Sequence, residues 1–241
     1  MKTAIISDIH GNARALKAIL NDMEQQDVQQ LYVIGDICFR GPEPKNALET
    51  VRALPAKVLQ GNADLWTVRG LQKEEVPEKA LAIMNQEREW TAERLTEADM
   101  DYLAQLPAEF YDEIGNGLKM HTFHATPDSL FEPVKKDASA DELRNKLTLE
   151  RDADVYVYGH VHTPFVREVN GKTIVNTGSV GLPFDHDPRP SYAIIDTSTG
   201  KIEATIRRVS YNLDEVINQY DANNYPNSEQ MKTIIRDGAI K

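Results

Sequence analysis

The 241-residue sequence has little of what marks secreted or membrane-spanning proteins. Its single cysteine, Cys38, cannot form a disulfide within the chain, which fits a reducing compartment. The apolar runs are short, as at Ala4–Ile6, and none approaches the roughly 20 residues that a membrane helix needs. The first residues lead straight into a strand-like segment, without the apolar core of a signal peptide. We therefore expect a cytoplasmic protein without a membrane span.

Basic residues are also scarce: 27 lysines and arginines stand against 38 aspartates and glutamates, a formal net charge of −11. Such a charge repels polyanions, and nucleic-acid-binding proteins usually present a basic face. We therefore expect no nucleic-acid partner. A small phosphorylated substrate is compatible with the charge, because bound metal cations would dominate the field inside a site. The oligomeric state is left open.

Internal repeats, low-complexity linkers and clear domain boundaries are absent, so we expect one domain over residues 1–241. Short apolar segments alternate with helical periodicity in the first 60 residues, which indicates parallel strand pairing through crossovers. The expected strands are Lys2–Ser7, Leu31–Ile34, Lys57–Leu59, Phe110–Ile114, Leu118–His124, Val155–Tyr158, Phe165–Val169, Thr173–Asn176, Tyr192–Asp196 and Ile202–Val209. The expected helices are Ala13–Gln26, Lys45–Ala53 and Asp137–Glu150.

Two further stretches are predicted to be helical. Residues 78–106 are charged, show helical periodicity and carry no strand signal, so we expect two or three helices in an insert spanning about 70–106. The polar residues of about 211–241 are expected to form a helical tail. We expect the insert to cover one side of the site as a lid or small subdomain.

Polar side chains follow five of the expected strands at the point where each strand ends. In open α/β sheets, ligands bind outside the carboxyl ends of the strands, so these side chains should meet at one edge. Four of the six histidines of the chain belong to this set. The candidate metal ligands are Asp8, His10, Asp36, Asn62, His124, His160 and His162.

The residue types explain why a metal site is expected. Imidazole and carboxylate together suit first-row metals, and we expect Mn or Fe, with Zn, Ni or Mg as alternatives. Two ions about 4 Å apart can hold a hydroxide and clamp a phosphoryl group for in-line attack. Glycines before Asp36, Asn62 and His160 would let the backbone come close to the ions. Each motif alone is weak, because single histidines after strands and Gly-Asp pairs are usually structural, but the whole ordered set favours a binuclear centre.

This ordered set resembles the calcineurin-like metallophosphoesterase superfamily, and within it the small bacterial and archaeal phosphodiesterase group. The resemblance covers about residues 2–209. It rests on Ser7–Asn12, on Gly35-Asp36 followed by Gly41–Pro44, on Gly61-Asn62, on His124, on Gly159-His160-x-His162, and on Gly178–Gly181 followed by Pro183.

The resemblance implies a four-layer αββα sandwich, in which two mixed β-sheets are flanked by helices. It implies one metal at Asp8, His10, Asp36 and His162, and another at Asp36, Asn62, His124 and His160, with Asp36 as the bridge. Asp36, Asn62 and Asp64 are the expected catalytic residues. Asn62, Asn12 and Arg40 are the expected substrate-binding residues, although Asn12 is at least as well explained as a helix N-cap and Arg40 equally well as a solvated loop charge.

Two positions depart from the family pattern. Many members have histidine after Gly-Asn, where it is thought to assist the leaving group, but this chain has Ala63. Because a general acid contributes about 10²–10⁴-fold, its loss should favour activated diesters or anhydrides. Arginine often follows the C-terminal proline motif, but here Phe184 does, which predicts an apolar or stacking surface.

We therefore expect a metal-dependent phosphodiesterase that uses a hydroxide held by two metals to attack a small phosphodiester or nucleotide. A diadenosine-polyphosphate hydrolase or a phosphoprotein phosphatase is the alternative, although Ala63 counts against the phosphatase. A metal-binding interaction scaffold, like the retromer subunit of the superfamily, is the non-enzyme alternative, and the intact ligands count against it. His121 is expected to be structural and His186 to lie on a solvated loop, while Trp66 and Trp90 are expected to pack rather than to stack on a base.

Overall fold

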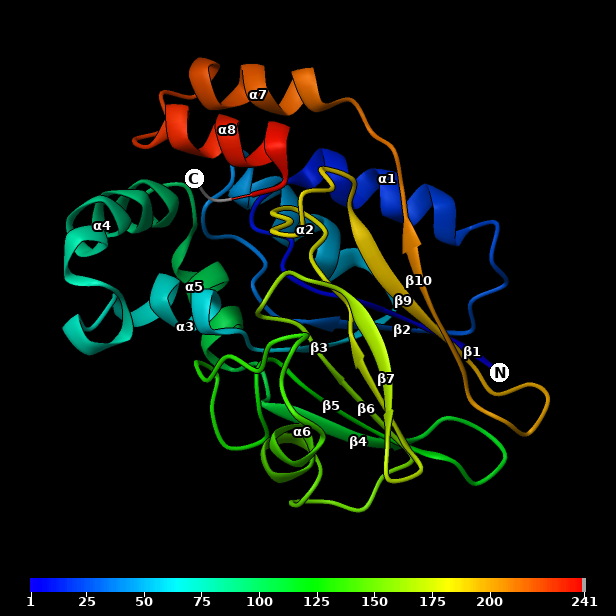
Figure 1. Cartoon of the computed structure of the whole chain (residues 1–241). Coiled ribbons are helices and arrows are strands. Elements are labelled where there is room, and N and C mark those ends of the chain that lie inside the picture. Colours follow the sequence, from blue (N-terminus) through cyan, green and yellow to red (C-terminus); the bar gives the residue numbers. More distant parts are fainter. Residues whose placement is uncertain (240–241) are drawn as a thin grey trace.

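Two five-stranded sheets face each other in the chain. The computed structural model describes residues 1–239. The first sheet has the order β10-β9-β1-β2-β3, with β1 (Lys2–Ile6), β2 (Gln30–Ile34), β3 (Ala56–Leu59), β9 (Ser191–Asp196) and β10 (Glu203–Arg208). The second has the order β4-β5-β6-β8-β7, with β4 (Glu109–Glu113), β5 (Lys119–Phe123), β6 (Val155–Tyr158), β7 (Phe165–Val169) and β8 (Lys172–Asn176). Helices flank both sheets, so the predicted four-layer sandwich is confirmed (Figure 1).

The strands that precede the candidate ligands pair in parallel. β1, β2 and β3 are parallel neighbours in the first sheet, and β5, β6 and β8 are parallel neighbours in the second. On one sheet β9 and the edge strand β10 run antiparallel to their partners, and on the other the edge strands β4 and β7 do so. The parallel core confirms the sequence-based expectation, and it brings the carboxyl ends of the ligand-bearing strands to one side.

Burial on both faces explains the apolar runs of the central strands. In β1, Ile5 packs into the core between the two sheets, while Ala4 and Ile6 pack beneath the outer helices. In β6, Val157 faces the core between the sheets and Tyr158 faces outward, toward α6. Alternate residues of a strand point to opposite faces, so a strand buried on both sides is apolar along its whole length.

Three helices cover the outer faces of the sheets. α1 (Ala13–Met23) and α2 (Pro44–Ala53) pack on the first sheet, and α6 (Ala140–Leu147) packs on the second. α6 is shorter than the expected Asp137–Glu150 because it begins after Ser139, whose side chain accepts a hydrogen bond from the backbone N–H of Glu142.

The segment after β3 is helical, as expected, but its first helix was not predicted. It contains α3 (Asn62–Arg69), the short 3₁₀ turn η1 (Lys73–Glu75), α4 (Glu78–Ala92) and α5 (Glu97–Ala104). α3 begins at the candidate ligand Asn62 itself. Trp66 of this helix packs against Phe39, which confirms its structural role.

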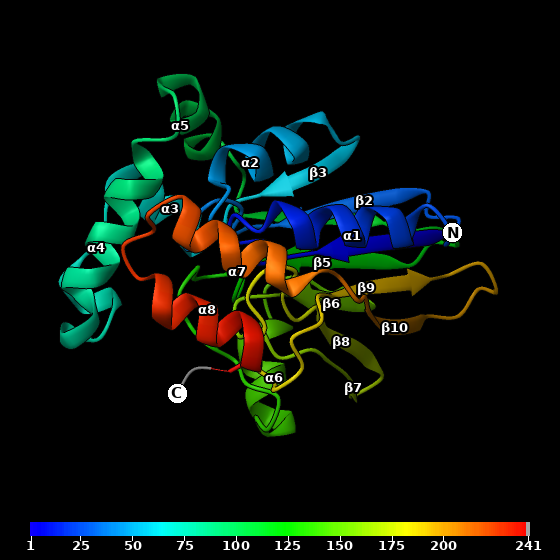
Figure 2. The same ribbon diagram turned by 90° about the horizontal axis from the view of Figure 1, so that it is seen from above.

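The C-terminal residues form α7 (Leu213–Ala222) and α8 (Ser228–Asp237), as expected. Both views show these helices side by side, on the same side of the molecule as α4 (Figure 2). Trp90 of α4 packs edge-on against Tyr225 between α7 and α8, so it too is a packing residue. Within residues 1–239, no helix is long and apolar enough to cross a membrane.

Candidate metal centre

The seven candidate ligands lie in the loops that follow parallel strands. Asp8 and His10 follow β1, Asp36 follows β2, Asn62 follows β3, His124 follows β5, and His160 and His162 follow β6. All are buried except His160, which is partly exposed. The structure brings all seven together in two groups that share Asp36.

The first group of ligands consists of Asp8, His10, Asp36 and His162, whose ligating atoms all lie within 4.8 Å of one another. The Nε2 atom of His162 is 3.0 Å from Oδ1 of Asp8 and 3.2 Å from Nε2 of His10. The Nε2 atom of His10 is 3.6 Å from Oδ2 of Asp36. Two carboxylates and two imidazoles therefore converge on one small volume.

Hydrogen bonds on the far side of each ring show which nitrogen is available. Nδ1 of His10 lies 2.8 Å from the carbonyl oxygen of Phe39, and Nδ1 of His162 bonds the carbonyl of Leu182. A carbonyl only accepts, so both Nδ1 atoms carry the hydrogen and both Nε2 atoms present lone pairs to each other. Oδ1 of Asp8, buried beside them, has no hydrogen-bond donor. Facing lone pairs and an orphaned carboxylate oxygen fit a bound cation.

The second group shares Asp36 and adds Asn62, His124 and His160. Oδ1 of Asn62 is 2.9 Å from Nε2 of His124 and 2.8 Å from Nδ1 of His160. Nε2 of His124 is also 3.4 Å from Oδ2 of Asp36. The outer nitrogens of the two rings bond the carbonyls of Ile34 and Phe131, so each inner nitrogen faces oxygen atoms and offers a lone pair once its ring is neutral.

The backbone is left-handed at most of these ligands. The φ angles are 56° at Asp8, 47° at His10, 58° at Asp36, 65° at His160 and 54° at His162. Each such residue costs on the order of 1–3 kcal/mol, and residues of this kind cluster at functional sites. Asp and His adopt this conformation more often than most residues, but the preference is too weak to predict it at a given position.

Two glycines allow the ligand loops to approach one another. A Cβ atom at Gly61 would overlap Asp36, and one at Gly159 would overlap Ser7 and lie 2.5 Å from Oδ2 of Asp8. The expected role of these glycines was to bring backbone close to the ions. The structure shows that they bring one ligand loop close to the next.

The histidines of the centre differ in basicity. Burial and the charge of His162 lower the pKa of His10 to about 4, and burial and the charge of His124 lower the pKa of His160 to about 4. Burial acts on His124 as well, but the carboxylate of Asp36 outweighs it and raises the pKa of His124 to about 10. A cation must therefore displace the proton held between His124 and Asp36, so metal binding should weaken as the pH falls.

Asp64, one of the expected catalytic residues, is held by three backbone amides beside the centre. One carboxylate oxygen accepts hydrogen bonds from the backbone N–H groups of Asp36 (2.8 Å) and Gly61 (2.9 Å), and the other accepts one from Ile37 (2.8 Å). Burial and the charge of Asp36 raise the pKa of Asp64 to about 7, which would suit an acid. The side chain is fully buried and both oxygens face amides, an arrangement that suits positioning of the Asp36 loop, and the expected catalytic role of Asp64 stays a prediction.

Asn12, expected either to bind substrate or to cap a helix, makes its hydrogen bonds within the protein. Its Oδ1 accepts a hydrogen bond from the N–H of Ala15 at 3.0 Å and so caps α1. Its Nδ2 donates to the carbonyl of Gly181 and to Oη of Tyr211, each at 3.2 Å. The amide is fully used within the protein, and the helix N-cap interpretation is confirmed.

Arg40 is held between the metal loop and the helices around it. Its Nε lies 3.4 Å from the fully buried carboxylate of Glu87 on α4, and its Nη2 lies 3.5 Å from the sulfur of Met231 on α8. Its carbonyl accepts a hydrogen bond from Oη of Tyr220 on α7. Arg40 thus connects the loop after Asp36 to α4, α7 and α8, and its contact with substrate stays a prediction.

Ala63 occupies an enclosed position beside the centre. Its backbone N–H donates to Oδ1 of Asp36 at 2.7 Å. Its side chain is buried with Phe39 and Trp66. The methyl group therefore lies in an apolar cluster that includes two aromatic rings.

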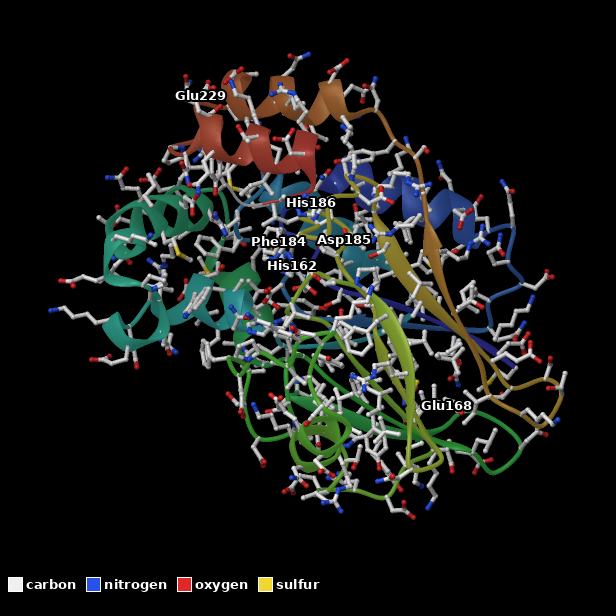
Figure 3. All side chains as sticks on the ribbon, in the orientation of Figure 1. His162, Glu168, Phe184, Asp185, His186 and Glu229 are labelled. Carbon is white, nitrogen blue, oxygen red and sulfur yellow. The ribbon has the colours of Figure 1, made fainter. Side chains whose placement is uncertain are left out.

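The remaining residues near the centre behave as the sequence indicated. Phe184 stacks on His162, with ring centroids 4.3 Å apart and planes inclined by 14°, and a stacking surface for a ligand stays a prediction (Figure 3). His121 is buried and lies 2.6 Å from Oε2 of Glu109 on β4, so it is structural. His186 is exposed on its loop.

Comparison with known proteins agrees with this geometry. The profile of the calcineurin-like phosphoesterase superfamily domain matches residues 1–200. The chain belongs to this superfamily. It is therefore a hydrolase of phosphoester bonds in a metal-dependent family, and its cluster of Asp8, His10, Asp36 and His162 suits metal binding.

Relatives match nearly the whole chain. An uncharacterized protein of Methanocaldococcus jannaschii is 31% identical over 242 residues, covering 92% of this chain and 93% of that protein. Phosphodiesterase YfcE of Escherichia coli K12 is 28% identical over 200 residues, covering 81% of this chain and 88% of that protein. The crystal structure of a metallophosphoesterase from Sphaerobacter thermophilus superimposes with a TM-score of 0.79 at 28% identity, covering 99% of each chain.

Proposed function

We propose that this phosphoesterase is a two-metal phosphodiesterase that acts on a small phosphodiester or nucleotide. The observation that carries the proposal is the position of Asp36. Its Oδ2 lies 3.6 Å from Nε2 of His10 in one ligand group and 3.4 Å from Nε2 of His124 in the other. A carboxylate oxygen shared in this way is suited to bridging two ions.

Asp8, His10, Asp36 and His162 would hold one ion, and Asp36, Asn62, His124 and His160 the other. Mixed imidazole and oxygen ligands suit Mn or Fe, with Zn, Ni or Mg as alternatives. Two bound ions would supply an activated water and neutralise charge on the phosphoryl group.

The protein's own groups would position the substrate. The Oδ1 atom of Asn62 faces the ligand histidines, which leaves its Nδ2 to donate a hydrogen bond to a phosphoryl oxygen. The site offers no imidazole at Ala63 to protonate a leaving group, so substrates with stable leaving groups should react best.

The test is hydrolysis of bis(p-nitrophenyl) phosphate by metal-free protein supplied in turn with Mn²⁺, Fe²⁺, Zn²⁺, Ni²⁺ and Mg²⁺. We expect turnover with Mn²⁺ or Fe²⁺ and its loss in EDTA. The absence of turnover with every metal, in protein shown to contain metal, would refute the proposal. Diadenosine tetraphosphate and a phosphopeptide, assayed in parallel, test the alternatives of a dinucleoside-polyphosphate hydrolase and a phosphoprotein phosphatase.

A further inference from the structure

A pocket of about 690 Å³ opens directly beside His160. It is formed by the β5–α6, β6–β7 and β8–β9 loops, and its walls include Pro133, Val161 and the ring of Phe184. Its volume lies within the roughly 300–1,000 Å³ typical of small-molecule sites. A molecule bound there would touch one residue of the candidate metal centre, so the pocket adjoins the place where a phosphoryl group would react.

Phe184 is a rigid part of this wall. One face of its ring stacks on His162, and the side chain also packs against the apolar cluster formed by α7 and α8. Figure 3 shows Phe184 next to His162 at the centre of the molecule. An aromatic side chain that is held before binding loses little conformational freedom, so it favours a flat apolar group in the ligand.

Two lysines give the pocket a local positive charge. Lys135 and Lys136 line it and are exposed, and among residues 1–239 neither ammonium group has an ion pair with a described partner. One carboxylate, that of Asp137, lies at the same rim. In a chain with a net charge of −11, an excess of unpaired lysines next to the metal centre is complementary to an anionic ligand.

We propose that this pocket is the nucleoside subsite of the centre. It would bind a nucleotide whose aromatic base packs against Phe184, Val161 and Pro133, while Lys135 and Lys136 bind a second phosphate group. The phosphoryl group that reacts would lie at Asn62 and His160. This inference rests on the proposed function and narrows its substrate to nucleotides with a second anionic group.

Three esters with the same p-nitrophenolate leaving group test the subsite. They are methyl p-nitrophenyl phosphate, thymidine 5′-(p-nitrophenyl phosphate) and its 3′-phosphorylated form. Because the bond broken is the same in all three esters, ratios of kcat/KM report how well the methyl, thymidine or phosphorylated thymidine group binds. We expect kcat/KM to rise about tenfold when thymidine replaces methyl and about threefold more when the 3′-phosphate is added.

Variants separate the two contributions. Phe184→Ala should remove most of the thymidine-to-methyl preference, whereas the control Phe184→Tyr, which keeps the ring, should retain it. The double variant Lys135→Ala/Lys136→Ala should remove the additional preference for the 3′-phosphate. Its control, Lys17→Ala/Lys201→Ala, removes two exposed lysines outside the pocket and should retain that preference. Ratios are used because Phe184 touches His162 and its loss can change absolute rates.

Unchanged ratios in Phe184→Ala, or no thymidine preference in the wild-type protein, would overturn the subsite while leaving the phosphodiesterase intact. If metal-loaded protein hydrolyses none of the three esters, the proposed function fails instead. The affinity for thymidine 3′,5′-bisphosphate, measured by titration calorimetry, then tests the subsite independently of turnover. Affinity about tenfold weaker in Phe184→Ala would support it, and equal affinity in wild type and variant would refute it.

Discussion

Replacing Asp64 with asparagine tests whether this buried carboxylate holds the Asp36 loop in place. One oxygen of Asp64 accepts two backbone N–H groups, from Asp36 and Gly61, and the other accepts one, from Ile37. In Asp64→Asn, the amide oxygen can occupy the first position and keep two hydrogen bonds. The amide nitrogen then faces the N–H of Ile37, donor against donor.

The expected cost follows from that one lost bond. An unsatisfied buried donor costs about 1–3 kcal/mol, so Asp64→Asn should lower the free energy of unfolding by about that amount. Asp64→Ala removes the acceptor for all three N–H groups and should cost more, about 3–5 kcal/mol. The Asp36 loop would also be less well positioned, so metal affinity should fall in the same order.

Urea unfolding of metal-free protein gives the stability change, and calorimetric titration with Mn²⁺ gives the metal affinity. The pH dependence of kcat/KM separates a positioning role from a catalytic one. A positioning residue lowers activity at every pH without removing either limb of the profile. Loss of one limb in Asp64→Asn, with stability and metal affinity unchanged, would refute this account and restore Asp64 as a general acid.

Three further outcomes follow from the packing around the centre. Glu87→Ala removes the fully buried ion-pair partner of the partly exposed Arg40 and should destabilise the protein by about 1–3 kcal/mol. The exposed Glu89→Ala on the same helix should change stability by less than about 0.5 kcal/mol in urea unfolding. Ala63→His forces a larger side chain into an enclosed position, so it should cost about 1–3 kcal/mol; an unchanged free energy of unfolding would contradict this. Burial raises the pKa of Asp99, but hydrogen bonds from Lys45 and Thr96 outweigh it and hold the pKa at about 2. The stabilising effect of this carboxylate should therefore be present above pH 4 and be lost toward pH 2, and Asp99→Asn should reduce the fall in the free energy of unfolding over that range.

Much of the centre could be predicted because the sequence next to each ligand indicates where that ligand lies. Asp8, Asp36 and His160 each directly follow an apolar strand, and parallel strands end at the same edge of a sheet. The strand pattern therefore predicted which side chains would meet. The one missed helix, α3, had a signal in Asp64, the third residue of the helix, whose side chain bonds the N–H of Gly61.

Other features depend on contacts between distant residues, for which no local pattern exists. The side-chain amide of Asn12 has no free donor because Tyr211, 199 positions later, accepts one of its hydrogen bonds. Arg40 turns toward Glu87 and Met231 because α8, more than 180 positions away, covers the loop. The left-handed backbone at the ligand histidines likewise depends on the surrounding structure, because the preference of His for this conformation is weak.

The most direct test of the account is the number of metal ions bound per chain, measured by elemental analysis after reconstitution and removal of free metal. Because Asp36 lies between both ligand groups, we expect two ions in the wild-type protein, and neither a binuclear centre nor turnover in Asp36→Asn. Asp27→Asn makes the same change at an exposed aspartate that is also left-handed, and it should still bind two ions. Two ions retained in Asp36→Asn, or a single ion in the wild-type protein, would contradict the bridged centre.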